Sequence, residues 1–210
     1  MKTPTPPLTV APLNTTDLPA AANLFARAFD NDRMARLLDP DQAQRLRFQE
    51  RAGKVQIKRA MAYRHVFAAY EGEAVRGIAV WLPPGVTLRP SPPPLRAIPR
   101  IVKAIAQPGA TRLIRHRHRA LAQAHEAPSW HLSFLATDPA HQGRGIGRRL
   151  LEHILQRAGA DGTPVWLETT DPANVGLYER FGFTTTAHIH GVAGLPTFWV
   201  MVHPGIRDPA

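Results

Sequence analysis

Three glycines (Gly143, Gly145 and Gly147) alternate with other residues between an expected strand (residues 130–137) and an expected helix (residues 148–158). Glycine permits positive φ angles and close approach of a ligand to the main chain, so successive N–H groups can converge on one anion. The unpaired amides and the positive dipole end of the following helix add to this attraction. The spacing therefore predicts a loop that cradles a phosphate or pyrophosphate.

Two other glycine-rich phosphate motifs fit this segment less well. A P-loop ends in Gly-Lys-Ser/Thr, which the segment lacks. The dinucleotide motif G-x-G-x-x-G accommodates Gly143 and Gly145, and Glu168 follows at about the expected 20 residues, but the third glycine position is Arg148. A glycine-rich turn that binds nothing is the other alternative, because short motifs recur by chance.

The composition fits one sizeable domain with a hydrophobic core. The chain has 210 residues, of which 44% are hydrophobic, and no apolar run approaches the ~18 residues of a membrane span. The polar, proline-rich N-terminus has no apolar signal core. We therefore expect a cytoplasmic protein with a single domain over residues 1–210 and no membrane partner. The absence of cysteine excludes disulfides, thiolate metal ligands and a cysteine nucleophile, and we expect no metal.

The hydrophobic pattern predicts strands and helices on both sides of the loop. Within the strand at residues 130–137, alternation places Trp130, Leu132, Phe134 and Ala136 on one face. The expected strands are residues 8–13, 65–70, 75–82, 130–137, 165–169, 183–190 and 197–203, and the second and third form an antiparallel hairpin. The expected helices are residues 17–31 and 171–182, capped by Asp17 and Asp171, residues 41–58 and 148–158, and two between residues 95 and 121.

The segment at about residues 83–126 is expected to be an insertion between two strands, and it carries most of the charge. Prolines make its first part a stiff connector, and two helices follow. Between Arg89 and Glu126, eight basic residues stand against one acid, which accounts for +7 of the formal net charge of +10. This concentration favours an acidic substrate, nucleic acid or CoA phosphates as partner, although a solvated helix face is the commoner explanation.

The stretch at residues 130–201 resembles the GNAT superfamily of acyl-CoA-dependent N-acyltransferases. The resemblance rests on Thr137-Asp138-Pro139, then Gln142-x-x-Gly145-x-Gly147, then Leu167-Glu168-Thr169-Thr170, and then Asn174-Val175-Gly176-Leu177-Tyr178-Glu179-Arg180-Phe181-Gly182-Phe183. The earlier elements match the family's order of strand, helices and hairpin but carry no motif.

The resemblance implies an α/β (α+β) GNAT fold, in which helices flank a mixed, mostly antiparallel sheet of about six or seven strands. The sheet is expected to splay where the strand ending at Thr137 parts from the strand starting at Val165, with acetyl-CoA bound in the splay. The loop amides would hold the pyrophosphate, aided by Arg144 and Arg148, and the backbone of residues 135–137 would pair with the pantetheine arm. The expected acetyl-CoA contacts are Leu135, Ala136, Thr137, Gln142, Gly143, Arg144, Gly145, Ile146, Gly147, Arg148, Asn174 and Tyr178.

Acyl transfer to an amine needs a group that donates a proton and a group that accepts one. The attacking amine loses a proton, and the departing thiolate gains one. The resemblance places Tyr178 beside the thioester sulfur, and a phenol with a pKa near 10 suits a thiolate with a pKa of about 8.5. A tyrosine that only packs on its helix is the alternative. His131 and Glu168 are the candidate bases, but structural hydrogen bonds explain both equally well, and a water chain would make both dispensable.

We therefore expect an N-acetyltransferase that moves an acetyl group from acetyl-CoA directly to a primary amine, since no cysteine can carry a covalent intermediate. A domain that binds acyl-CoA without turnover is the alternative. A nucleic-acid-binding protein is less favoured, because no aromatic residue interleaves the basic cluster. The acceptor stays open: a small-molecule amine is expected first, a protein acceptor and a homodimer are not excluded, and the basic insertion favours an acceptor with a carboxylate or phosphate.

Overall fold

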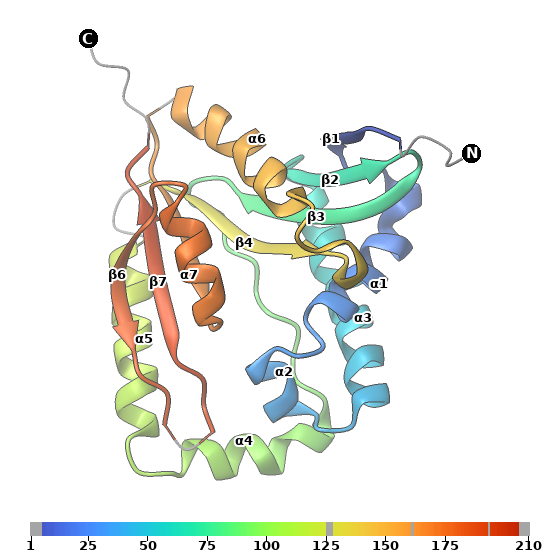
Figure 1. Ribbon diagram of the computed structural model, residues 1–210. Helices are drawn as coiled ribbons and strands as arrows, with labels where there is room; N and C mark the ends of the chain where they lie inside the picture. Colours follow the sequence, from blue (N-terminus) through green and yellow to red (C-terminus); the bar gives the residue numbers. More distant parts are fainter. Residues whose placement is uncertain (1–5, 125–127, 161, 193, 206–210) are drawn as a thin grey trace.

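The computed structural model describes residues 6–124, 128–160, 162–192 and 194–205, and these form a seven-stranded sheet in the order β1-β2-β3-β4-β5-β7-β6 (Figure 1). Neighbouring strands are antiparallel except β4 and β5, which run parallel. The strands are β1 (Leu8–Pro12), β2 (Val66–Glu71), β3 (Ala74–Leu82), β4 (Trp130–Thr137), β5 (Val165–Thr169), β6 (Thr184–Ile189) and β7 (Phe198–His203). The expected mixed, mostly antiparallel sheet is confirmed.

Helices cover both faces of this sheet (Figure 1). Helices α6 and α7 lie on one face, and α1, α3 and α5 lie on the other. The helices are α1 (Leu18–Ala28), α2 (Arg33–Leu38), α3 (Gln42–Met61), α4 (Ile98–Ile105), α5 (Ala110–Ala124), α6 (Ile146–Ala160) and α7 (Pro172–Glu179), with short 3-10 turns η1 (Thr15–Asp17), η2 (Leu95–Ala97) and η3 (Pro139–His141). Among the helices in the described ranges, none is long and apolar enough to cross a membrane.

Helix α2 is absent from the sequence-based expectation, which ran a single helix from residue 17 to residue 31. The chain leaves α1 after Ala28, and Asp32 then caps α2 by accepting a hydrogen bond from the backbone N–H of Ala35 (2.9 Å). Asp17 is at the N-cap position of α1 as expected, but its carboxylate makes no capping hydrogen bond and instead accepts a hydrogen bond from the Tyr70 hydroxyl (2.9 Å).

A bulge in β4 overturns the expected distribution of its side chains. Phe134 pairs with Val80 and Leu132 with Trp81, so Ser133 is an extra residue in the register. Leu132 consequently belongs to the core cluster under α6, and Phe134 belongs to the cluster under α1. The expectation that both side chains share a face was wrong, because an inserted residue breaks the two-residue alternation of a strand.

The parallel strands β4 and β5 part soon after they begin. Their register runs from Trp130↔Val165 to Leu132↔Leu167, and in the described structure no pairing continues beyond it. The bulge at Ser133 therefore lies where pairing stops, and the rest of β4 (residues 133–137) turns away from the end of β5. The expected splay between these strands is confirmed.

The segment between β3 and β4 forms a connector followed by η2, α4 and α5. Helix α5 packs on β6 and β7, where Leu113 and Ala120 share a cluster with Phe198 and Val200. The last residues of the expected insertion (125–126) and both ends of the expected single domain lie outside the described residues. The division into one domain with an insertion stays a prediction.

Candidate active site

The glycine loop joins the end of β4 to the start of α6. Gly143 and Gly145 both have φ +76°, and a Cβ added to either would meet no described atom within 4 Å. The positive φ explains the requirement for glycine, and the open space leaves the main chain accessible to a ligand. Gly147 differs, because it lies in the first turn of α6 and a Cβ there would contact Thr137 Oγ1 at 3.6 Å.

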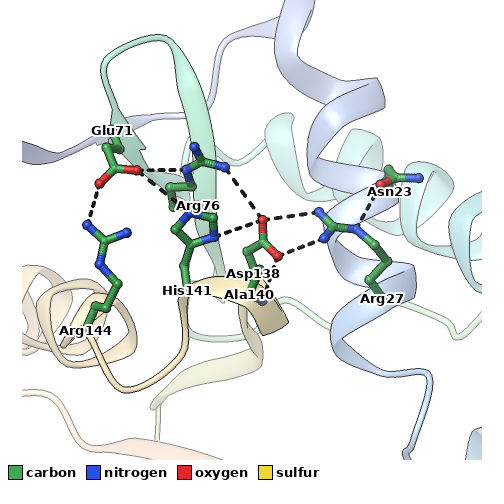
Figure 2. A network of polar contacts seen from close by, with 8 residues as sticks. All are labelled: Asn23, Arg27, Glu71, Arg76, Asp138, Ala140, His141 and Arg144. Carbon is green, nitrogen blue, oxygen red and sulfur yellow. Dashed lines mark hydrogen bonds and ion pairs between the residues drawn. The ribbon is translucent and has the colours of Figure 1, made fainter. Parts of the chain in front are cut away.

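A polar network fixes the turn that leads into this loop (Figure 2). Asp138 is only 4% exposed, and it accepts hydrogen bonds from Nη1 of Arg27 (2.8 Å) and from the backbone N–H of Ala140 (3.2 Å). Burial disfavours the charged carboxylate, but Arg27 and the Ala140 N–H outweigh it and hold the pKa of Asp138 below its usual value. The turn after β4 is thereby tied to α1.

A second carboxylate of the network reaches the loop itself. Glu71, at the end of β2, accepts hydrogen bonds from Arg144 Nη2 (2.6 Å) and Arg76 Nε (3.1 Å). The bond from Arg144 is the main reason that the pKa of Glu71 lies below its usual value. Figure 2 shows His141 between the two carboxylates, with Nδ1 3.4 Å from Asp138 Oδ2 and Nε2 3.9 Å from Glu71 Oε2. The loop is thus linked to the β2–β3 hairpin, a role that sequence reasoning missed.

The two arginines expected to assist the phosphates remain at the surface. Arg144 is 47% exposed at its side chain while it pairs with Glu71. Arg148 is 70% exposed and pairs with Glu152 one helical turn later, with Nε 2.7 Å from Oε1. Both guanidinium groups therefore lie beside the loop and are accessible from solvent.

Helix α7 carries Asn174 and Tyr178 on the same face of the sheet as α6. Asp171 caps it by accepting a hydrogen bond from the Ala173 N–H (3.0 Å), as expected. Tyr178 is 7% exposed and packs edge-to-face on Phe183, with ring centroids 5.7 Å apart. Burial raises the pKa of Tyr178 to about 12, so the phenol keeps its proton across the neutral range.

Glu168 lies on the opposite face of the sheet and forms an ion pair with Arg117 of α5. Nε and Nη2 of Arg117 donate to Oε2 and Oε1 of Glu168, both at 2.7 Å. The same guanidinium lies 4.9 Å from the centre of the Phe198 ring. Arg117 was predicted only as one member of a basic cluster, because nothing in the local sequence connects it with a residue 51 positions away.

His131 is also on this second face, but at the closed end of the splay. Its ring stacks on Trp166 with centroids 3.7 Å apart, and the two residues are register partners in β4 and β5. The structure therefore separates the three catalytic candidates: His131 and Glu168 lie on the α5 face, and Tyr178 lies on the α7 face.

A pocket of 440 Å³ opens beside Glu168. Its walls come from α2, α4, α5 and the residues around the start of β7, and they are mostly apolar. Glu168, Arg117 and Thr170 are the polar side chains among the described residues that line it. The Thr170 hydroxyl donates a hydrogen bond to Asp32 Oδ2 (2.9 Å), which holds the start of α2 against the end of β5.

Comparison with known proteins identifies relatives for parts of this chain. A mycothiol acetyltransferase from Beutenbergia cavernae is 34% identical over 74 residues, which cover 34% of this chain and 25% of that protein. A [ribosomal protein bS18]-alanine N-acetyltransferase from Salmonella typhimurium is 42% identical over 52 residues, which cover 23% of this chain and 35% of that protein. The chain therefore matches only about a quarter to a third of the length of these curated relatives.

Solved structures are similar over almost the whole chain. A Corynebacterium glutamicum structure described as histone acetyltransferase HPA2 and related acetyltransferase matches 97% of this chain and 99% of its own, with a TM-score of 0.67 and 24% identity. The ribosomal-protein-S18-alanine N-acetyltransferase from Escherichia coli matches 97% of both chains, with a TM-score of 0.59 and 19% identity. At these identities the likeness concerns the fold. The family model for the Acetyltransferase (GNAT) family matches residues 23–183, and the chain therefore belongs to this family.

Proposed function

We propose that this protein is an N-acetyltransferase that transfers the acetyl group of acetyl-CoA directly to a primary amine. The observation that supports it best is the placement of an open, glycine-built loop and a buried, protonated tyrosine on the same side of a splayed pair of strands. Membership of the family and the names of the relatives agree with this reaction.

The residues around the loop suit the donor. Acetyl-CoA supplies an activated acyl group as a thioester. The amides of residues 142–148 would hold its diphosphate, since they combine positive-φ glycines with a helix N-terminus. The backbone of Leu135, Ala136 and Thr137 faces the splay and would pair with the amide-containing arm as an added strand does. Asn174, half-buried on α7, would contact the same arm.

Tyr178 is the proposed general acid. In the overall reaction one C–S bond breaks, one C–N bond forms, the amine loses a proton and the sulfur gains one. Burial keeps the Tyr178 phenol protonated near neutral pH, so it carries a proton that the leaving sulfur could gain.

For the base, the placement favours Glu168 over His131. Glu168 lines the pocket where the strands part, whereas His131 is stacked on Trp166 at the closed end. Because Arg117 donates to both oxygens of Glu168, we propose that this carboxylate receives the proton of the acceptor amine through a water molecule and not by direct contact.

Replacement of Tyr178 by phenylalanine tests the assignment. We expect kcat to fall by about 10²-fold or more while the Kd for acetyl-CoA, measured by calorimetry, is unchanged, because general acids contribute about 10²–10⁴-fold. Tyr63→Phe is the matched control, since Tyr63 is 40% exposed and lies just after the end of α3. Full turnover by Tyr178→Phe with normal acetyl-CoA binding would refute the role of the phenol.

An assay of the wild-type protein distinguishes the enzyme from the non-catalytic alternative, a domain that binds acyl-CoA without turnover. CoA release is measured with acetyl-CoA and a panel of primary amines of differing charge and polarity. An enzyme releases CoA with at least one amine, whereas a sensing domain binds acetyl-CoA and releases CoA with none.

A further inference from the structure

We propose that the pocket beside Glu168 is the acceptor site and that it selects primary amines whose remaining part is apolar and uncharged, such as an alkyl chain or an aromatic ring. This inference rests on the proposed function, because it names the substrate class of the same site.

The pocket lies where an acceptor has to enter. Glu168 and Thr170 line it and flank Thr169, the last residue of β5, just beyond the last β4–β5 pair at Leu132↔Leu167. Its walls belong to the α5 face, whereas the glycine loop and Tyr178 belong to the α6 and α7 face. An amine seated here therefore approaches the splay from the side opposite the donor.

The lining has the chemistry of an apolar substrate. Helix α4 contributes Ile101, Ala104 and Ile105, and α2 contributes three more apolar side chains. Within the described lining, the charged groups are Arg117 and Glu168, and they neutralise each other through two hydrogen bonds of 2.7 Å. A second charge on the acceptor would be buried against hydrocarbon without a partner, which is costly.

The basic cluster of the insertion does not define this pocket. Arg112, Arg115 and Arg119 are exposed on α5 and are not among its described lining residues. Arg117 lines the pocket, but its charge is matched by Glu168. The chemistry of the walls therefore points to an apolar acceptor rather than to the acidic acceptor that the charge of the basic insertion favoured.

The pocket is held open by contacts at both ends of α2. Thr170 bonds to Asp32 before the helix, and Arg96 of η2 donates from Nε to Asp39 Oδ2 (2.7 Å) after it. Asp39 is 3% exposed, so this second tie is buried at its acidic end. A preformed cavity of this kind binds an apolar group without the entropic cost of ordering the side chains that line it. Ile105 is nevertheless 44% exposed in this structure, which leaves apolar surface for a ligand to cover.

The first test compares ligands of matched shape. Hexylamine and 1,5-diaminopentane have the same length and differ by a terminal methyl group against a charged amine, and 6-aminohexanoic acid carries a carboxylate instead. With acetyl-CoA as donor, we expect kcat/KM for hexylamine to exceed that for each of the other two by at least about tenfold, because the second charge would lose its hydration. Equal or better use of the diamine or the amino acid would overturn the proposal.

The second test compares two isoleucines of α4. Ile105→Ser should weaken the binding of hexylamine, measured by calorimetry, by about fivefold or more, because it removes apolar contact area from the pocket. Ile98→Ser is the matched control: Ile98 is 45% exposed on the same helix but is not among the described lining residues. Thermal melting checks that both variants fold. Equal hexylamine affinity in the two variants would refute the pocket assignment.

The two proposals fail in different ways. If hexylamine binds and Ile105→Ser weakens it, but no amine causes CoA release, the pocket assignment stands and the proposed reaction falls. If polar amines are acetylated while hexylamine neither binds nor reacts, the reaction stands and the apolar pocket falls.

Discussion

The two faces of the sheet meet at one splay but present different chemical surfaces there. On the α6 and α7 face, main-chain N–H groups of a glycine loop are presented to solvent, and a network of ion pairs holds the loop from the protein side. On the α5 face, side chains from α2, α4, α5 and β7 assemble an apolar pocket with one neutralised ion pair. The glycine loop of the first face is one short segment of the sequence, whereas the pocket of the second face is built from several segments that are far apart in the sequence. This difference explains why the sequence predicts a donor but does not predict an acceptor.

The largest effect is expected in the loop. Gly145→Val should weaken acetyl-CoA binding by about 100-fold or more, because a β-branched residue resists the positive φ of +76° and would turn the amides away from the diphosphate. Gly85→Val is the matched control, since Gly85 has φ +79° and equally open surroundings in a loop after β3. Both variants should lose similar stability in thermal melts. Comparable acetyl-CoA affinity in both would show that the loop amides do not bind the donor.

A smaller effect is expected beneath the loop, where the sequence offers its own control. The tetrapeptide Thr-Asp-Pro-Ala follows both splaying strands, at residues 137–140 and 170–173. Asp138→Asn should reduce the free energy of unfolding by about 2 kcal/mol at pH 7, because it removes a buried charge that two partners hydrogen-bond. Asp171→Asn should change it little, since Asp171 is exposed and asparagine caps a helix as well as aspartate does.

The same pair gives a dependence on pH. The pKa of Asp138 is lower in the folded protein than in the unfolded chain, where it is about 3.9. The contribution of the ionised carboxylate to the free energy of unfolding is therefore complete above the unfolded pKa and is lost as the pH falls through the lower folded pKa. Denaturant titrations of wild type and Asp138→Asn should therefore converge only in strong acid. A gap between the two proteins that stays constant down to the lowest pH would show that the charge of Asp138 is not what stabilises the turn.

The smallest effect is expected on the acceptor face. Arg117→Ala should cost about 1 kcal/mol of unfolding free energy, because its ion pair with Glu168 is partly exposed, with side-chain exposures of 34% and 20%. Arg115→Ala, on an exposed face of the same helix, should cost nothing measurable by thermal melting. Equal melting temperatures in the two variants would show that the pair adds nothing measurable to stability.

Local signals in the sequence were sufficient for most of the fold. The hairpin of β2 and β3, the extent of β4 and the cap of α7 at Asp171 each follow from residues adjacent in the chain. The expected first helix was extended past its true end at Ala28, and helix α2 was missed because the residues that follow Asp32 were assigned to no element. The bulge at Ser133 has no local signature, since it is defined by the partner strand.

The site divides in the same way. Positive φ at Gly143 and Gly145 was predictable because it depends on residue type. The hydrogen bonds and ion pairs that hold the loop and the pocket were not predictable, because they join residues such as Glu71 and Arg144, which lie 73 positions apart. The sequence drew attention to Glu168 and Arg117 separately, by their residue types. Only the packing of α5 on the sheet shows that they form an ion pair.

The contacts that tie the ends of β4 and β5 to α1 and α2 also limit the order in which the molecule can fold. Arg27 and Asp138 are 111 positions apart, and Asp32 and Thr170 are 138 positions apart. Contacts of such long range form late, since most of the chain must be in place before they can stabilise anything. A growing polypeptide on the ribosome therefore lacks the first tie until Asp138 has emerged and the second until Thr170 has emerged, so the second is the later of the two to become available.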